Sequence, residues 1–471
     1  MERRTKIVAT IGPASDSPAQ LEAMARAGMD VARLGLAHAP LEESIDRYQR
    51  IRDVEAIIGR PIGVLVDLPG PKIRCAPFTN GGVLVTDGQE LLLSPGQDKS
   101  TTEAVEVDYE SLLIDLHVGD RLTFGDGSVV TEVVDRKDDA LVTRICHGGE
   151  LQGRPGLHIP SDRLRVSTPT PADLKMVDAF VEVGVDMVAL SFVRSAHDVR
   201  RVGTEPFPRG PLIVAKIETR AAVDNLAGIV EEAGAIMVAR GDLGAECPIE
   251  ELPHLQKRII RDCIAYGRPV ITATQMLESM VHAPTPTRAE ASDVANAVFD
   301  GSSAVMLSGE TAIGDDPVNV VTTMAQITQR ADEEFDYRGW ARDLLELRQQ
   351  KAPEGDSAIT DAMTMATWRA AAELDVAAIL CLSETGFTVR SIARFRPEAK
   401  IHGYSTDPRT VQQLTMSWGT IPMRSAESSA GEPMATEAIR LAKEAGHVRS
   451  GDMVAVLSGF NHHSKATDMQ R

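Results

Sequence analysis

Short apolar runs, each followed by a stretch with helical spacing, recur along the first two thirds of the chain. Strands that are buried on both faces read as nearly continuous apolar runs. The eight runs of this kind are Lys6–Gly12, Met29–Leu36, Ile62–Leu68, Met187–Val193, Leu212–Glu218, Ala235–Gly241, Pro269–Met276 and Ser303–Glu310. Eight successive strand–helix units predict an α/β fold built on a closed (β/α)₈ TIM barrel rather than an open sheet.

One long interruption separates the third run from the fourth. Residues 70–162 are rich in Gly, Val, Thr and Asp, and they contain short strand-like segments between turns. These segments are Val83–Val85, Glu90–Leu93, Arg121–Phe124, Val129–Val134 and Ala140–Ile145. We therefore expect a small β-barrel domain inserted at the catalytic end of the large barrel.

The last third of the chain has a different pattern. It is helical to about Gln350, with a charged stretch at Ala331–Gly355 that is typical of a linker or surface helix. Helical and strand patterns then alternate, which predicts a doubly wound α/β domain. Its predicted elements are Ala358–Leu374, Val376–Cys381, Phe387–Phe395, Lys400–Ser405 and Met453–Leu457. The predicted domains are residues 1–69 with 163–335, residues 70–162, and residues 336–471.

Charge and cysteine usage narrow the class of protein. A net charge of −19 argues against nucleic acid and anionic membrane as partners, because both attract basic surfaces. The first residues lack the apolar core of a signal peptide, and the apolar runs are too short to span a bilayer. The five cysteines are scattered without a CxxC pair, so we expect neither a disulfide framework nor a structural zinc site. A reducing cytoplasmic location is the simplest interpretation.

Polar residues gather where the predicted strands end, which is the catalytic face of such a barrel. Glu218 and Asp242 follow adjacent strands and offer the hard oxygen ligands that Mg²⁺ or Mn²⁺ prefers. Lys216 shares a face with Glu218, because residues i and i+2 of a strand point the same way. Arg33 and Arg74 can bind phosphate in fork geometry. This set of charges suits phosphoryl transfer, which needs positioning and charge neutralisation.

Two neighbouring residues at the end of the sixth predicted strand, Arg240 and Gly241, are interpreted separately. Gly241 lies at an expected helix start, where backbone N–H groups can approach an anion closely. Arg240, beside it, is as compatible with a structural ion pair as with a catalytic role.

Longer motifs connect these residues to a known family. TKIVATIGPAS, KIE, MVARGDLG, ATQMLESM, PTRAEASDVANAV and MLSGETA occur in order along nearly the whole chain and together resemble the pyruvate kinase family. The resemblance implies a barrel domain, a β-rich lid, and a C-terminal domain for effectors and assembly into a homotetramer. It also implies Mg²⁺-dependent transfer of a phosphoryl group from phosphoenolpyruvate to ADP in glycolysis, giving pyruvate and ATP.

The resemblance also assigns roles to residues. Glu218 and Asp242 are the implied metal ligands, Lys216 balances the charge of the transferring group, and His38 and Arg74 lie on the nucleotide side. Phosphoenolpyruvate is implied to lie among Arg33, Gly241, Asp242 and Thr274. The complete set of residues with an implied catalytic role is Lys216, Thr274, Arg33, Arg74, Ser308 and Glu310.

Some positions depart from the usual family pattern. Gly35 and Ala37 replace an Asn and a Ser that help to hold K⁺ in typical members, and Lys72 replaces a Glu in the segment that begins at Asp67. A lysine ammonium carries the same charge as K⁺ and would repel a second cation. The resemblance is therefore to the K⁺-independent type.

Two further departures lie on the nucleotide side of the pocket. Ile313 replaces a Lys, and Arg154-Pro155-Gly156 replaces a KKG motif.

The C-terminal domain contains a candidate effector site. Its segment Ser383-Glu384-Thr385-Gly386-Phe387-Thr388 lies between a predicted strand and helix, where hydroxyls and free N–H groups can hold a phosphate. It resembles the family's sugar-phosphate loop, so Ser383, Thr385, Gly386 and Thr388 are candidates for binding a sugar phosphate or AMP. An ordinary helix cap is the alternative. We interpret His462 and His463 as part of a solvated tail.

Three functions stay open at this point. The first is an active pyruvate kinase. The second is a paralogue that uses the same metal–enolate site on another 2-oxo acid or phosphoenol substrate. The departures from the family pattern at Gly35, Ala37 and Ile313 support this alternative. The third is a weakly catalytic regulatory or scaffold subunit, against which the retained Lys216 and Glu218 argue.

Overall fold

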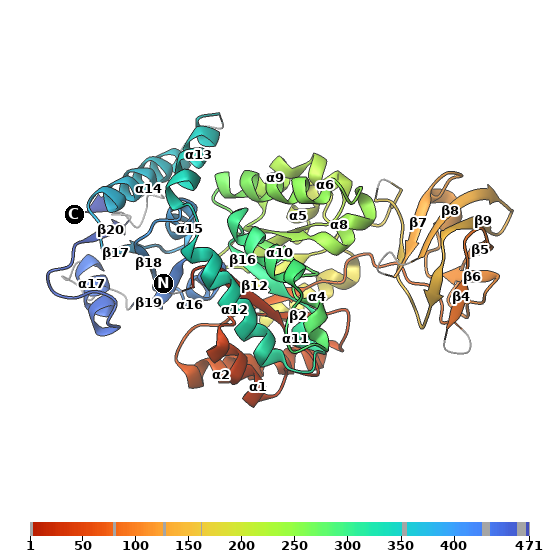
Figure 1. Cartoon of the computed structure of the whole chain (residues 1–471), viewed down its shortest axis with the longest axis horizontal. Helices are drawn as coiled ribbons and strands as arrows, with labels where there is room; N and C mark the ends of the chain where they lie inside the picture. Colours follow the sequence, from red (N-terminus) through yellow and green to blue (C-terminus); the bar gives the residue numbers. More distant parts are fainter. Residues whose placement is uncertain are drawn as a thin grey trace.

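The structure, a computed structural model, describes residues 3–78, 82–125, 129–161, 163–350, 356–425, 434–458 and 468–470. A central barrel lies between a β-rich domain on one side and an α/β domain on the other (Figure 1). We propose the domain boundaries that the sequence suggests, near residues 69/70, 162/163 and 335/336. Residue 162, His462 and His463 lie outside the described residues.

The central domain confirms the predicted (β/α)₈ barrel. Its eight parallel strands close in the order β1-β16-β15-β14-β13-β12-β3-β2. The strands are Lys6–Thr10 (β1), Val31–Gly35 (β2), Gly63–Asp67 (β3), Met187–Leu190 (β12), Leu212–Ile217 (β13), Ala235–Ala239 (β14), Val270–Ala273 (β15) and Ala304–Leu307 (β16). All eight predicted strands are present, but the apolar runs extend into the adjoining loops, so the prediction overestimates their lengths.

Helices surround the barrel and cover its outer face. They are Pro18–Ala27 (α1), Leu41–Ile58 (α2), Pro171–Glu182 (α4), Ala196–Arg200 (α5), Arg220–Asp224 (α6), Leu226–Glu232 (α7), Arg240–Glu246 (α8), Leu252–Ala265 (α9), Glu278–Val281 (η2, 3₁₀), Arg288–Phe299 (α10), Gly309–Ala312 (α11) and Pro317–Glu333 (α12). Several begin at side-chain caps. Thr170 and Thr287, for example, each form a capping box with the acidic residue three positions on.

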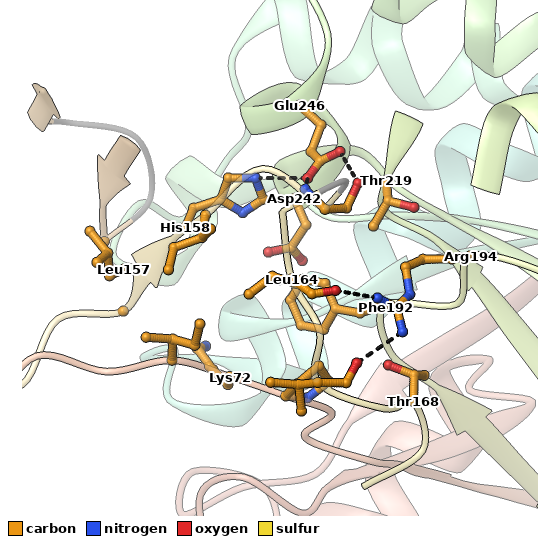
Figure 2. A pocket seen from close by; sticks show the side chains of 17 residues that line it. Lys72, Leu157, His158, Leu164, Thr168, Phe192, Arg194, Thr219, Asp242 and Glu246 are labelled. Carbon is orange, nitrogen blue, oxygen red and sulfur yellow. Dashed lines mark hydrogen bonds and ion pairs between the residues drawn. The ribbon is translucent and has the colours of Figure 1, made fainter. Parts of the chain in front are cut away.

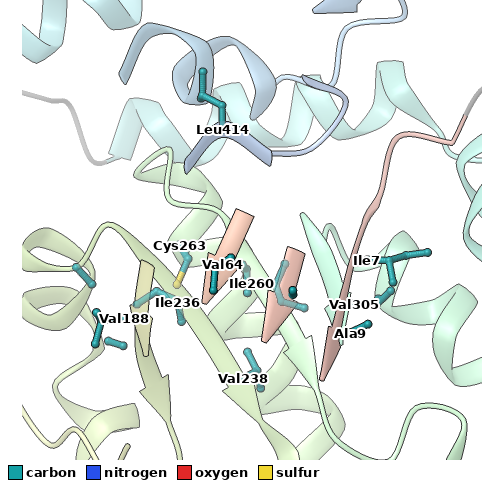
Figure 3. Close-up of a cluster of buried hydrophobic side chains, with 14 of the residues drawn as sticks. Ile7, Ala9, Val64, Val188, Ile236, Val238, Ile260, Cys263, Val305 and Leu414 are labelled. Carbon is teal, nitrogen blue, oxygen red and sulfur yellow. The ribbon is translucent and has the colours of Figure 1, made fainter. Parts of the chain in front are cut away.

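Alternation along the strands divides the barrel core into two layers. Ile7 and Ala9 face the helices, and Val8 between them faces the barrel axis. Figure 3 shows the outer layer, in which Val238 and Val305 lie among the strands with Ile260 nearby. The same alternation aims strand-end side chains into the mouth of the barrel.

The inserted domain confirms the five predicted strands and adds three. Its elements are Val83–Val85 (β4), Glu90–Pro95 (β5), Ala104–Val107 (β6), Leu112–Asp115 (α3), Arg121–Phe124 (β7), Val129–Arg136 (β8), Leu141–His147 (β9), Gly149–Leu151 (β10) and Leu157–His158 (β11). The prediction of a small closed barrel is wrong in detail. The described strands form a six-stranded sheet, β11-β7-β8-β9-β5-β6, and a separate β10-β4 pair, because β10 and β4 are short and bond only to each other.

The C-terminal domain confirms the doubly wound prediction. Its elements are Asp356–Glu373 (α14), Ala378–Leu382 (β17), Phe387–Ala393 (α15), Lys400–Ser405 (β18), Pro408–Gln413 (α16), Leu414–Met416 (η3, 3₁₀), Thr420–Arg424 (β19), Met434–Glu444 (α17), Val454–Ser458 (β20) and Asp468–Gln470 (β21). Ile379 and Cys381 of β17 pack in one cluster with Val389 of α15. Leu380, between them, packs in another with Ala438 of α17, so helices cover both faces of the sheet.

The charged stretch that we interpreted as a linker or surface helix is more structured than expected. Helix α12 continues to Glu333, and Tyr337–Gln350 (α13) follows almost at once. Tyr337, Ala341 and Leu344 of α13 are buried, so this helix forms part of the domain packing.

The barrel and the C-terminal domain meet closely. Met416 of η3 belongs to the apolar cluster inside the barrel. A Cβ at Gly63 would collide with Thr415 of the same segment, so the contact requires glycine there. Within the described part of the chain, no helix is both long enough and apolar enough to cross a membrane.

Candidate active site

The mouth of the barrel collects charged side chains by strand periodicity. On β13, Leu212 and Val214 face the barrel axis, and Lys216 is the next residue on that face. Arg33 follows Val31 on β2, and Asp67 follows Leu65 on β3, in the same way. On each of these three strands, the inward-facing side chains are apolar inside the barrel and polar at the carboxyl end of the strand.

Lys216 lies at the centre of this group. Its Nζ donates to Ser191 Oγ at 2.8 Å and lies 2.7 Å from Glu218 Oε1 and 3.3 Å from Asp67 Oδ1. Burial alone would lower the pKa of Lys216, but the carboxylates of Asp67 and Glu218 outweigh it and raise that pKa. The ammonium group is therefore held charged.

Asp67 joins Lys216 to Arg33. Arg33 Nε donates to Asp67 Oδ2 at 2.7 Å, and its Nη1 donates to Thr10 Oγ1 at 2.9 Å. Burial opposes ionisation of Asp67, yet Lys216 and Arg33 hold its pKa below the usual range. The guanidinium group of Arg33 is thereby fixed at the mouth of the barrel while part of it stays accessible.

Glu218 and Asp242 follow the adjacent strands β13 and β14. Glu218 is fully buried and accepts a hydrogen bond from Phe192 N at 2.6 Å. Burial, partly offset by Lys216 and reinforced by Asp242, raises the pKa of Glu218 to about 7. Asp242 lies in the first turn of α8 and is exposed to the neighbouring cavity.

These two carboxylates fit a divalent cation that is completed by other oxygens. Glu218 Oε1 is buried and accepts no well-directed hydrogen bond from the described residues, although Lys216 lies nearby. Among those residues, no group of three or more His, Cys, Asp or Glu side chains could hold a metal by itself. A hard cation that keeps water and substrate oxygens as ligands needs only one or two carboxylates from the protein.

The loop after β15 holds Thr274 in a strained conformation next to α8. Thr274 has φ 69° and Gln275 has φ 55°, backbone angles that residues other than glycine rarely adopt. Thr274 Oγ1 accepts from Gly241 N at 2.9 Å, and Arg240 Nη2 donates to Thr274 O at 2.6 Å. Arg240 also pairs with Asp293 at 2.7 Å. Arg240 thus has a structural ion pair and helps to hold Thr274 in place.

A cavity of about 70 Å³ lies between the barrel mouth and the inserted domain (Figure 2). Lys72 and Leu157 reach it from the inserted domain's side, and Asp242, Phe192 and Arg194 reach it from the barrel. Arg194 donates to Leu164 O at 2.8 Å and to Val166 O at 2.9 Å. Its charge is thus used to fix the returning chain, and the cavity is a partly open space lined by Asp242.

Glu246, at the end of α8, lies in this cavity wall, and the sequence analysis did not identify it. Its carboxylate accepts from Ser161 N at 2.8 Å, Ser161 Oγ at 2.7 Å and Arg220 N at 3.0 Å, and it lies 3.2 Å from His158 Nε2. Burial opposes ionisation, but His158 and Ser161 outweigh it and lower the pKa of Glu246. Glu246 therefore ties the inserted domain to the helix that carries Asp242.

Comparisons with known proteins agree with this architecture. A family model of the pyruvate kinase barrel domain matches residues 2–321, and one of the pyruvate kinase alpha/beta domain matches residues 361–471. The chain belongs to the pyruvate kinase family. Pyruvate kinases of Bacillus licheniformis and Geobacillus stearothermophilus are 38% and 39% identical to it. These matches cover 100% and 98% of this chain and 80% and 78% of the relatives.

A third relative is similar in length as well as in sequence. The pyruvate kinase of Methylorubrum extorquens is 37% identical over 97% of this chain and 94% of its own. The family membership makes this chain a phosphotransferase of the pyruvate kinase type, as the sequence motifs predict.

The remaining residues with roles implied by the pyruvate kinase resemblance lie around the same mouth. Glu310 is buried and accepts from Leu277 N at 3.1 Å and from Ser308 N at 2.6 Å, so it holds two backbone segments together. Partial burial and the cations Lys72 and Arg33 lower the pKa of His38.

Arg74 bridges to Gly156 through the backbone and donates to Arg154 O at 3.4 Å. It therefore lies on the connection to the inserted domain.

Ser191 is a further residue that sequence reasoning missed. It accepts from Lys216 and donates to Leu68 O at 2.7 Å, which links strands β3, β12 and β13. Its position was a usable signal, because Ser191 is the next inward-facing residue after Met187 and Ala189 of β12.

Proposed function

We propose that this chain is an active pyruvate kinase that transfers a phosphoryl group from phosphoenolpyruvate to ADP. The observation that carries the proposal is the placement of Lys216 Nζ within 3.3 Å of both Asp67 and Glu218, at the mouth of the barrel. One ammonium group and one guanidinium group, both anchored by carboxylates, lie beside a cavity with a further free-standing carboxylate, Asp242. This arrangement suits binding and transfer of a phosphoryl group.

Arg33 and Lys216 bind and orient the phosphoryl group. Both are pre-positioned by Asp67, so they need not reorganise as charge develops on the transferring oxygens. Glu218 and Asp242 would hold Mg²⁺ or Mn²⁺, which would supply charge neutralisation for the phosphoryl group. The inserted domain closes over the cavity and excludes water from the transferring group.

Thr274 lies where the enolate of pyruvate takes its proton. Its hydroxyl is held by Gly241 N and by Ala273 O, so its orientation is fixed within the loop. We propose that this hydroxyl, together with Ser308 and Glu310, relays the proton to the enolate. His38 and Arg74 bind the nucleotide side.

A coupled assay tests the function directly. Purified protein would be supplied with phosphoenolpyruvate, ADP and Mg²⁺, and pyruvate and ATP would be measured separately. Stoichiometric formation of both products is expected. Pyruvate without ATP, or turnover of another 2-oxo acid such as oxaloacetate in its place, would show a paralogous reaction at the same site. No turnover of either kind would indicate a regulatory subunit.

Activity is also proposed not to require K⁺. Lys72 lines the cavity, and its pKa is lowered by burial and by Arg74, while Asp242 acts against that shift. Gly35 faces Arg33 and His38 without an oxygen-bearing side chain. The ammonium of Lys72 thus supplies a fixed positive charge near the place where K⁺ would lie, and the second-strand oxygens for K⁺ are missing.

Replacing K⁺ by Na⁺ or tetramethylammonium at constant ionic strength tests this proposal. The rate is expected to change little. A manyfold loss of rate without K⁺ would contradict it. Lys72→Glu by itself is not expected to create K⁺ activation, because Gly35 and Ala37 still lack the oxygens that would hold the ion.

The C-terminal loop is proposed to bind a sugar phosphate or AMP. Gly386 has φ 73° and is the N-cap residue of α15, and Phe387 N donates to Thr385 Oγ1 at 3.4 Å. Ser383 N donates to Tyr404 O at 2.9 Å, which fixes the start of the loop. Thr385 is exposed and Thr388 is largely buried.

Isothermal titration with sugar phosphates and AMP would detect this binding. The heat is expected to disappear in a Thr385→Ala, Thr388→Ala double variant, and heat that persists would place the site elsewhere. We also propose a homotetramer, which light scattering on the purified protein would test.

A further inference from the structure

A second, smaller cavity lies at the other end of the barrel, against the C-terminal domain. Its volume is about 10 Å³, close to the smallest space that holds one water molecule. Gly267 and Arg268, between α9 and β15, form its barrel side. The C-terminal domain contributes Arg390, Arg394 and the pair Ser417 and Trp418.

Residues around this cavity carry several buried donors without partners. Arg390 Nε and Nη1, Arg394 Nε and Trp418 Nε1 are buried and have no hydrogen-bond partner among the described residues. Ser417 Oγ is also buried and has no hydrogen-bond partner among these residues. Arg390 and Trp418 are each 2% exposed, so solvent does not satisfy them. Leaving such groups unpaired costs roughly 1–3 kcal/mol each, and more for charged groups.

The residues that line the cavity also carry an excess of positive charge. Four arginines line it, and no Asp or Glu does so among the described residues. The four are Arg268, Arg390, Arg394 and Arg396. A carboxylate of Asp361 pairs with Arg394 Nη2. Burial and the neighbouring Arg268 lower the pKa of Arg390 to about 9, which is the response of a cation that lacks a counter-charge.

Two of the four arginines are otherwise satisfied. Arg268 donates to Val230 O at 3.0 Å and to Glu231 O at 2.9 Å. Arg396 Nη2 donates to Ser302 O at 2.7 Å, and its guanidinium lies 4.9 Å from the centre of the Trp418 ring. Arg390 and Arg394 also lie over aromatic rings, each 5.0 Å from the ring centre, of Phe207 and Phe395 respectively. The unmet demand for hydrogen-bond acceptors nevertheless rests on these two arginines and on the indole N–H of Trp418.

We propose that this cavity is a binding site for a small inorganic anion of the size of chloride. Guanidinium and indole N–H groups can only donate, so the occupant must accept hydrogen bonds on all sides. Water would fill the space but would leave the buried charge uncompensated. The small volume favours a monatomic anion over phosphate or sulfate.

The anion would also join two domains. Arg268 belongs to the barrel and Arg390 to the C-terminal domain, and their like charges repel across the interface. Arg390 Nη2 donates to Thr385 O at 2.8 Å, so the same guanidinium supports the C-terminal loop. An anion between the arginines replaces repulsion with attraction and stabilises the contact. This inference is independent of the proposed kinase activity.

Crystals of the wild-type protein provide the direct test. Protein crystallised without halide would be soaked in sodium bromide, and anomalous scattering would locate bound ions. A bromide peak between Arg390 and Arg394 is expected. A well-ordered cavity that contains no peak would overturn the proposal, and this test does not depend on any variant folding.

Thermal unfolding provides the second test. The Tm would be measured in sodium chloride and in sodium gluconate at equal ionic strength, because gluconate is too large for the cavity. Chloride is expected to raise the wild-type Tm relative to gluconate by on the order of 1–3 °C. Arg390→Met should abolish this difference, and Arg369→Met, which removes an exposed arginine of α14, should keep it. An equal response in all three proteins, or stabilisation by phosphate and sulfate alone, would contradict the proposal.

Discussion

Buried charge occurs at both ends of the barrel, but in two different states. At the mouth, Lys216 has Asp67 and Glu218 within 3.3 Å, and Arg33 has Asp67 at 2.7 Å. At the opposite end, Arg390 and Arg394 have buried N–H groups without acceptors among the described residues, and only Arg394 pairs with a carboxylate, that of Asp361. The first cluster is balanced by the protein, and the second has an excess of positive charge.

This difference bears on what each cluster can do. In the balanced cluster the carboxylates keep the cations charged and oriented, so the cations are ready for a substrate phosphoryl group. In the unbalanced cluster the free energy of the folded protein depends on something that the chain does not supply. A catalytic role is expected for the first and a binding or structural role for the second.

The largest effect is expected from removing Lys216, the central cation of the balanced cluster. Lys216→Met keeps most of the volume but removes the charge that faces the transferring group. A loss in kcat of about 10²–10³ is expected, as for other single electrostatic stabilisers of a transition state. Steady-state kinetics would measure it, with circular dichroism to check that the protein is folded.

A control variant shows whether the loss of kcat depends on where the lysine lies in the protein. Lys175→Met removes an exposed lysine of α4, on the outside of the barrel, and should leave kcat unchanged. Near wild-type kcat in Lys216→Met would refute the assignment of this cluster to catalysis.

Removing a carboxylate from the same cluster should act mainly on the metal. Glu218→Gln retains the shape and one oxygen but loses the negative charge, while Asp67 still holds Lys216. The Mg²⁺ concentration for half-maximal rate is expected to rise on the order of 10–100-fold. An unchanged Mg²⁺ dependence with a reduced kcat would instead indicate that Glu218 acts only by positioning Lys216.

Glu246 tests whether a balanced cluster also stabilises the inserted domain. Because its pKa is lowered in the folded state, the contribution is complete above the unfolded value of about 4.3 and is lost as the pH falls through the folded value. Glu246→Gln should cost about 1–3 kcal/mol near pH 7. Urea unfolding from pH 7 down to about pH 3 would measure it, and the difference from wild type should shrink once the pH falls below the unfolded value. A difference that grows toward acid pH would be inconsistent with this sign.

The smallest effect is expected where charge is neither buried nor unbalanced. Arg369 and Glu373 form a 3.0 Å ion pair on α14 with both side chains mostly exposed. Arg369→Met should change the free energy of unfolding by about 0.5 kcal/mol or less. A larger loss in urea unfolding would mean that exposed pairs matter here as much as buried ones, which would weaken the contrast between the two clusters.

Much of the fold follows from local patterns. The eight barrel strands and the C-terminal alternation were predictable because apolar periodicity is a local property. The sequence does not predict β6, β10 and β11 of the inserted domain, because these short segments become strands only through pairing with β5, β4 and β7. The closure of that domain was mispredicted because pairing between short strands depends on neighbours distant in the chain.

For the candidate site, the sequence could identify the residues but not how they pair. Arg33, Asp67, Lys216 and Glu218 could be found from sequence, because strand periodicity and strand ends place them at one face. The sequence alone did not reveal that Asp67 pairs with both Arg33 and Lys216, since these residues lie 34 and 149 positions from it.

Local patterns along the chain were enough to predict the barrel and the residues at its mouth. Which charges have partners depends on contacts that form only in the folded protein. The arginines at the domain interface show the reason most clearly. Arg268 and Arg390 come from different domains, and no local pattern records whether an acceptor will lie between them once both are buried. Whether buried charges are balanced depends on what the whole fold brings together, and periodicity carries no information about that.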